Sequence, residues 1–252
     1  CTPSAGEEKV NRNNGINYQM KKTLLVLVFS ILSLVSMFAE NVELKIHLLN
    51  GTVNTFIVDS SIDEIFGFKM HLSFNKNGKE LYRYEHKSPI IKIENLSMLS
   101  NIEKVELSME LHNFVDISGL ESVKIKELII TYGLNQKSLG SIIKMPNLKV
   151  LYLNSMEIFE INSWDLSKTK LEYIEISSSK VQKIYKIIFP DTLKYLNLVG
   201  NNIEEIDDET INQINSKNIT VFTDKYIPGI KKQINGTNIY KRFPQEYKRF
   251  LL

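Results

Sequence analysis

One apolar spacing recurs six times between Ile102 and Ile234, with a period of 22–23 residues. Each copy reads L-x-x-L-x-L and continues with apolar positions at offsets +10, +13 and +18 from its first residue. These offsets hold apolar residues at 31 of 36 positions, whereas a chain that is 43% hydrophobic would place about 15 there without a pattern. A repeat of this length indicates a solenoid, in which each coil buries its apolar edge against the next. The functional question therefore concerns a binding face more than a pocket.

Three copies carry an apolar residue at every offset. They are Leu148, Leu151, Leu153, Ile158, Ile161 and Leu166; Leu171, Ile174, Ile176, Val181, Ile184 and Phe189; and Leu193, Leu196, Leu198, Ile203, Ile206 and Ile211. Weaker copies begin at Ile102, Ile125 and Ser216. The last two apolar residues of L-x-x-L-x-L are two apart, so in an extended strand they point the same way, while the residue between them points to the opposite face. We therefore expect one parallel strand per coil.

Over roughly residues 100–234 the chain resembles the leucine-rich repeat family. The resemblance implies an α/β solenoid of about six coils of 22–23 residues, whose strands line a concave face. The family usually places Asn at offset +8 or +9, where its side chain satisfies backbone groups, and at offset +8 of this chain only Asn201 matches. A parallel β-helix is the alternative fold, since its coils are of similar length.

The start of the chain predicts export. Lys21 and Lys22 precede an apolar run that ends at Phe38, followed by Ala39, so residues 20–39 are predicted to be a signal peptide. The run is shorter than the about 20 apolar residues that span a bilayer, and an uncleaved anchor is the alternative. The predicted location is secreted, periplasmic or on the cell surface, and membrane contact is expected only through this segment if it stays uncleaved.

Residues 1–19 do not begin with Met and are predicted to be a non-native upstream extension. They contain the only cysteine, Cys1. Without residues 1–19 the chain has no cysteine and so no disulfide. Because small extracellular eukaryotic domains tend to be rich in disulfides, this absence favours a bacterial exported protein. After residue 39 the chain carries 27 basic and 27 acidic residues. This balance argues against nucleic acid as the principal ligand, which requires a basic face.

The two ends do not follow the repeat. Residues 40–100 alternate in hydrophobicity around two Asn-Gly turns, at 50–51 and 77–78, and predict two β-hairpins. A capping-box spacing at 61–64 predicts a short helix between them. We interpret this β-rich module as an N-terminal cap on repeats 101–234, with an independent ligand-binding module as the alternative.

Residues 235–252 are basic and aromatic. They are predicted to form a C-terminal cap or tail. A capping helix with solvated charges is one interpretation, and a tail that contacts a membrane surface or an anionic partner is the other. Pro244 is expected to start or interrupt any helix there.

The candidate binding residues lie at offsets +2, +4 and +6, which point away from the core. Tyrosines on adjacent predicted strands, with apolar and polar neighbours, are expected to form one exposed amphipathic patch like the centre of a protein interface. The predicted ligand-binding residues are Ile129, Val150, Tyr152, Tyr173, Glu175, Tyr195, Asn197 and Phe222. The alternative is that these rings only stack on each other and stabilise the sheet.

Catalytic motifs are not found in the sequence. The four histidines have no ligand spacing, and His112 replaces a core apolar residue of the repeat. There is no Gly-x-Ser-x-Gly elbow, phosphate-binding Gly loop or pair of cysteines. We therefore predict no catalytic residue, no metal site and no cofactor.

Together these patterns predict a non-enzymatic, exported module that binds a protein partner through the concave face of its repeats, in host interaction or adhesion. The first alternative is a structural or assembly scaffold within the cell envelope. The second is an enzyme with a site in the N-terminal module. The identity of the partner and the oligomeric state are left open.

Overall fold

The chain divides into two compact units, Cys1–Glu40 and Asn41–Leu252, and of the first unit only Glu40 is described. The predictions for residues 1–19 and 20–39 therefore lie outside the described residues. None of the helices in the described part of the chain is long and apolar enough to cross a membrane. The computed structural model describes residues 40–68, 70–108, 119–120, 124–132, 142–236 and 239–250.

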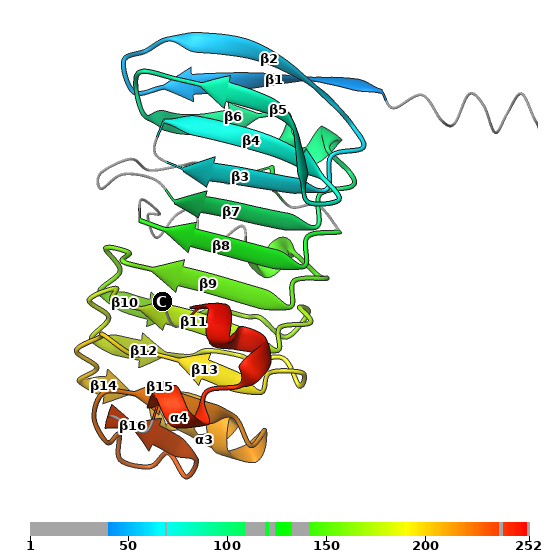
Figure 1. The fold of residues 1–252 in the computed structure, drawn as a ribbon. Helices are drawn as coiled ribbons and strands as arrows, with labels where there is room; N and C mark the ends of the chain where they lie inside the picture. The colour runs from blue at the N-terminus through cyan, green and yellow to red at the C-terminus, as the bar shows by residue number, and fades with distance from the viewer. Residues whose placement is uncertain are drawn as a thin grey trace, which may run out of the picture. The chain divides into compact units, whose positions relative to one another are not determined.

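The second unit is mostly β and has few helices, and its parallel strands stack as a β-solenoid of about four turns (Figure 1). In the described residues, ten strands form one long sheet in the order β16-β15-β13-β11-β9-β8-β7-β3-β4-β5. Neighbours from β3 to β16 pair in parallel, whereas β4 and β5 pair antiparallel. The strands are β3 (Glu64–Phe68), β4 (His71–Lys76), β5 (Lys79–Glu85), β7 (Lys104–Ser108), β8 (Glu127–Thr131), β9 (Val150–Asn154), β11 (Tyr173–Ser177), β13 (Tyr195–Asn197), β15 (Thr220–Thr223) and β16 (Gln233–Asn235).

The predicted stack of parallel strands is confirmed. Six strands, β7, β8, β9, β11, β13 and β15, begin at offset +2 or +4 of the six copies of the repeat. The two closely spaced leucines of each motif point into the solenoid: Leu151 and Leu153 of β9 are fully buried in its core, beside Ile174 and Ile176 of β11. The apolar spacing thus sets which residues form strands and which side of each strand faces inward.

The second side of the solenoid also carries strands, where only one strand per coil was expected. β10 (Glu160–Asn162), β12 (Lys183–Tyr185) and β14 (Glu205–Ile206) pair in parallel. Their middle or last residue is the isoleucine at offset +13, which is buried in the same core. The remaining helices are α3 (Asp208–Ser216), α4 (Ile239–Arg242) and the short 3-10 helices η1 (Leu96–Met98), η2 (Ile142–Lys144) and η4 (Gln245–Phe250).

Both N-terminal hairpins form as predicted. β1 (Asn41–Leu48) pairs antiparallel with β2 (Val53–Asp59), and β4 pairs with β5 through a turn in which Asn77 and Gly78 both have positive φ. A further strand that the sequence pattern did not reveal, β6 (Ile90–Glu94), pairs with β1.

The predicted helix at residues 61–64 is wrong, because Glu64 already begins strand β3. Ser61 donates its backbone N–H to Asp59 Oδ1 at 2.6 Å, so the segment turns at this point without entering a helix. β3 then pairs with β4 on one side and with β7 on the other. Hydrogen bonds to two neighbouring strands satisfy the backbone N–H and C=O groups of β3. A short helix would leave many of these groups at its ends without a partner. β3 thereby joins the β4–β5 hairpin to the parallel strands of the long sheet.

Gly67 in the middle of β3 has a packing role. A Cβ atom built there would lie 2.8 Å from Leu107 Cδ2 and 3.0 Å from Leu72 Cδ2. Glycine therefore allows the leucines of both neighbouring strands to meet over β3.

Candidate functional site

The long sheet has two sides with separate apolar clusters. One side belongs to the solenoid core. The other side carries the residues at offsets +2, +4 and +6, such as Val150 and Tyr152 of β9, and these form a second cluster with residues from the C-terminus. We call this second side the strand face.

The strand face contains all of the predicted binding residues. Tyr173 pairs directly with Val150 and with Tyr195, while Tyr152 lies one row further along, beside Glu175. The prediction that they are brought together on adjacent strands is confirmed. Ile129, Val150, Tyr173, Glu175, Asn197 and Phe222 are buried, and Tyr152 and Tyr195 are half-buried.

The prediction that these residues are exposed is wrong. Residues 239–250, which comprise α4 and η4 and which we call the C-terminal segment, lie across β11, β13 and β15 (Figure 1). The C-terminal segment therefore covers the part of the strand face around Tyr173. Tyr173, expected at the centre of an open patch, has 0% of its surface exposed.

The C-terminal segment presents one apolar side to the sheet. Ile239, Phe243, Tyr247 and Phe250 lie four, four and three residues apart, and all four are buried in one cluster with the strand face. Pro244 lies between α4 and η4, where it cannot donate a backbone hydrogen bond and so ends α4. Its carbonyl accepts the backbone N–H of Tyr247 at 3.1 Å, which starts η4.

Ring stacking joins the segment to the sheet. The Tyr247 ring stacks on the Tyr173 ring with centroids 4.5 Å apart and an interplanar angle of 15°. Phe250 stacks on Tyr152 at 5.1 Å and on Tyr173 at 5.6 Å. Phe243 contacts Tyr173 edge-on at 5.9 Å. Offset and edge-to-face contacts at these distances are favourable beyond the area that they bury.

One ion pair lies at the rim of this contact. Arg249 of the segment donates to Glu127 Oε1 of β8 at 2.8 Å, and its guanidinium lies 4.7 Å from the centroid of the Phe250 ring. The other carboxylate oxygen of Glu127, Oε2, is buried and has no hydrogen-bond partner among the described residues. The rim of the strand face thus offers an acidic site to a basic residue.

A buried carboxylate, that of Glu175, lies beside Tyr173 on the strand face. Glu175 is 3% exposed, and it accepts hydrogen bonds from the hydroxyls of Tyr173 and Ser177, the latter at 2.6 Å. Burial raises the pKa of Glu175 above its usual range, against the opposing effect of these hydrogen bonds and one from Asn197. Burial and the nearby Glu175 also raise the pKa values of Tyr152 and Tyr173, so both phenols stay protonated.

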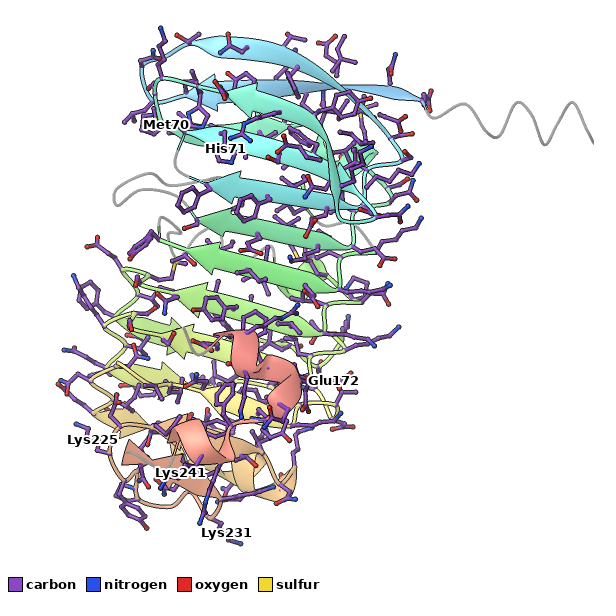
Figure 2. The ribbon with its side chains drawn as sticks, in the orientation of Figure 1. Met70, His71, Glu172, Lys225, Lys231 and Lys241 are labelled. Atoms are coloured by element: carbon purple, nitrogen blue, oxygen red, sulfur yellow. The ribbon has the colours of Figure 1, made fainter. Side chains whose placement is uncertain are left out.

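The C-terminal segment does not cover the part of the strand face that lies on β3 and β4. On β3 and β4, Phe66, Phe68 and His71 form a ring cluster with centroid distances of 6.3 to 6.5 Å, and Phe68 is 40% exposed. His71 and the neighbouring Met70 lie at this end of the sheet in Figure 2. Sequence reasoning missed these rings because it placed a helix at their start. Recognition of the alternation in Glu64, Phe66 and Phe68 as a strand would have found them.

A hollow of about 290 Å³ separates this open end from the covered part. Three of its seven lining side chains are charged, and one of them, Lys104, has its Nζ 3.2 Å from Glu106 Oε2 and 2.8 Å from Glu64 Oε1. Its lining residues are Lys104, Glu106, Ile129, Thr131, Tyr152, Arg249 and Phe250.

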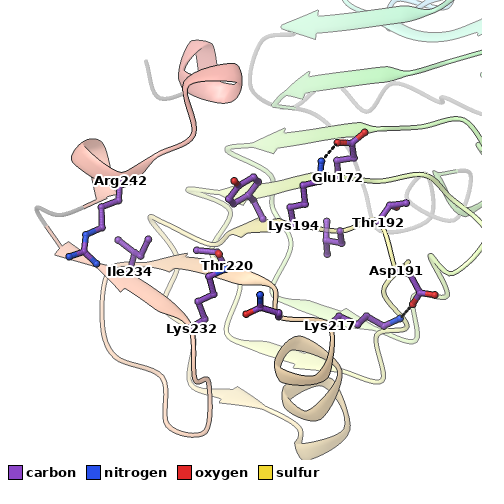
Figure 3. A pocket seen from close by; sticks show the side chains of 12 residues that line it. Glu172, Asp191, Thr192, Lys194, Lys217, Thr220, Lys232, Ile234 and Arg242 are labelled. Carbon is purple, nitrogen blue, oxygen red and sulfur yellow. Dashed lines mark hydrogen bonds and ion pairs between the residues drawn. The ribbon is translucent and has the colours of Figure 1, made fainter.

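A larger groove of about 670 Å³ runs between the C-terminal segment and the edge of the sheet (Figure 3). Two of its cations are paired, Lys194 with Glu172 at 2.6 Å and Lys217 with Asp191. Within the described part of the chain, no group of three or more His, Cys, Asp or Glu side chains could hold a metal ion.

Comparisons with known proteins do not extend this description. No family model matches the chain, and searches of curated proteins and of solved structures give no match to it.

Proposed function

We propose that this chain is an exported, non-enzymatic module that binds a protein partner through its strand face. The observation that carries the proposal is the C-terminal segment itself: the strand face holds a short polypeptide through stacked rings and a rim ion pair. Aromatic anchors in desolvated positions, with charged residues at the rim, are typical of protein interfaces.

We also propose that the coils belong to the leucine-rich repeat type and number about six. Support comes from Asn201, the only asparagine at offset +8. Its side-chain NH2 donates to the carbonyls of Ile176 at 2.6 Å and Leu198 at 3.0 Å. Its Oδ1 accepts the backbone N–H groups of Ser179 and Val181, each at 3.0 Å. One side chain thus makes three hydrogen bonds to the preceding coil and one within its own coil, which is the role that the resemblance implies.

Other polar residues perform part of this role at the same offset. Ser179 is fully buried, accepts the backbone N–H of Met156 at 3.0 Å and donates to the carbonyl of Ser177 at 2.7 Å. Asp224 accepts the backbone N–H of Gly200 at 2.6 Å. A repeated polar position that bonds to the preceding coil supports a common repeat origin for these coils.

The open end of the strand face offers the first contact surface for a partner. Phe66 and Phe68 expose aromatic surface there, next to the Lys104–Glu106 pair. An exposed ring cluster at the uncovered end of the same sheet face gives a partner an accessible apolar surface.

Photo-crosslinking in the native cell tests this proposal. A benzophenone side chain at position 68 is expected to capture a discrete protein adduct that survives stringent washing. The matched control is position 159, because Phe159 is also exposed, at 57%, but lies beside β10 on the other side of the solenoid. If positions 68 and 159 both yield no adduct while the protein is present at normal level, the binding proposal fails.

A structural scaffold within the cell envelope is the second candidate. The observation that favours it is the closure of most of the strand face by the chain's own rings, as a permanent cap would do. Protease treatment of intact cells separates the two locations. Loss of peptides from residues 142–236 while the envelope stays closed supports surface binding, and their protection until the envelope is opened supports the scaffold.

A further inference from the structure

We propose that the C-terminal segment is a displaceable occupant of the strand face, which gives way to a partner segment of the same chemistry. That partner segment is a short amphipathic stretch of another protein, with aromatic or aliphatic residues spaced four, four and three residues apart and a basic residue near its end. This inference rests on the proposed function and names the kind of partner and its competitor.

The segment can leave without opening the solenoid. Its buried residues Ile239, Phe243, Tyr247 and Phe250 belong to a cluster that is separate from the solenoid core. Core residues such as Leu151 keep their neighbours when the segment departs. Removal of the segment therefore exposes the strand face and leaves the stacking of the coils in place.

The C-terminal segment contains only short helices, which depend on the strand face for their stability. α4 has four residues and η4 has six, and helices this short are unstable in isolation. It follows Gly236, which is exposed and has a φ of +61°. The strand face orders the segment, so opening of the segment alone costs less free energy than unfolding the solenoid.

The strand face defines the chemistry of its occupant. Tyr152, Tyr173 and Tyr195 receive the aromatic side chains of the segment in stacked or edge-on contacts. Glu127 at the rim receives a guanidinium, which fixes the direction in which the occupant lies. A partner segment with the same four anchors and a basic residue meets the same rings and the same carboxylate.

The test uses the full chain with a protease site inserted directly after Gly236. A fluorescent peptide with the sequence of residues 239–250 is the probe, and fluorescence anisotropy reports its binding. The cleaved chain, separated from its own segment, is expected to bind the probe at least tenfold more tightly than the uncleaved chain. A scrambled peptide of the same composition is the control for spacing and is expected to bind at least tenfold more weakly.

Three results would overturn the inference. They are equal affinity of the cleaved and uncleaved chains, equal binding of the scrambled peptide, or a dimer of the uncleaved chain that exchanges segments and so makes a second copy the occupant. If cleavage unfolds the chain, the uncleaved double variant Phe243→Ala, Tyr247→Ala replaces it and must bind the probe at least tenfold more tightly than the unaltered chain. The crosslinking at position 68 is scored separately, so failure of the proposed function and failure of this inference are distinguishable.

Discussion

Substitution of Tyr247 by alanine tests how the C-terminal segment is held. Tyr247 is 9% exposed, stacks on Tyr173 at 4.5 Å and meets Tyr195 edge-on at 5.8 Å. Burial of such a ring contributes about 1.5–3 kcal/mol, and the ring pairs add roughly 0.5–1.5 kcal/mol. We therefore expect Tyr247→Ala to weaken docking of the segment by about 2–4 kcal/mol, which is a shift of roughly 30- to 900-fold in the docking equilibrium.

Amide hydrogen exchange measures this shift directly. The backbone N–H of Tyr247, bonded to the carbonyl of Pro244 at 3.1 Å, exchanges when the segment opens. Exchange in η4 is expected to accelerate in the variant, while the amides of β9 and β11 keep their rates because their core neighbours are unchanged. The midpoint of thermal unfolding of the solenoid is expected to stay nearly constant.

The matched control is Tyr226→Ala, because Tyr226 is 67% exposed and its ring makes no contact in the covered cluster. It removes the same side chain and is expected to leave exchange in η4 unchanged. If Tyr247→Ala left exchange in η4 within twofold of the unaltered chain, the reasoning about ring stacking would be refuted. Equal acceleration in β9 and η4 would refute it as well, since the segment would then be part of the solenoid core.

Three further predictions concern the coils, the buried carboxylate and the N-terminal strand. Asn201→Ala removes four hydrogen bonds and is expected to lower the free energy of unfolding in urea by about 2–4 kcal/mol. The control Asn202→Ala changes an exposed neighbour and is expected to change this free energy by under about 0.5 kcal/mol. Equal losses in the two variants would contradict the role of Asn201. Because burial raises the pKa of Glu175 above the ordinary value of 4.5, its protonated form favours the folded chain: this contribution to stability is fully present below about pH 4.5 and is lost as the pH rises through the raised pKa. The free energy of unfolding in urea measured against pH tests this, and Glu175→Gln is expected to abolish this part of the dependence; an unchanged dependence would assign it to another group. Gly67→Ala is expected to cost about 1–3 kcal/mol in thermal unfolding, since the new Cβ meets Leu107 at 2.8 Å, and no loss would mean that the leucine moves freely.

At residues 61–64, strand pairing in the tertiary structure overrides a local helix signal. The capping-box spacing at 61–64 is a valid helix signal, yet Glu64 begins a strand. The helix would have been short and poorly satisfied at its ends, whereas β3 gains hydrogen bonds from β4 and β7. A local signal of about 1 kcal/mol does not outweigh two complete strand pairings. The same error hid the rings of Phe66 and Phe68, which a strand at this position would have placed on the strand face.

The sequence by itself determined the repeat, its parallel strands and the side of each strand that faces the core. It could do so because each coil repeats the same short-range spacing, and the burial of Leu151 or Leu153 depends only on neighbours one period away. It also placed Tyr152, Tyr173 and Tyr195 together on one face.

Only the tertiary structure decided that this face is covered. The pair Arg249–Glu127 joins residues 122 positions apart, outside any period of the repeat. The aromatic residues of the C-terminal segment fit a capping helix, a free tail or a cover equally well, because local spacing sets only which side of the segment is apolar. The choice depends on the match between that side and the rings of distant strands, which exists only once the coils have stacked.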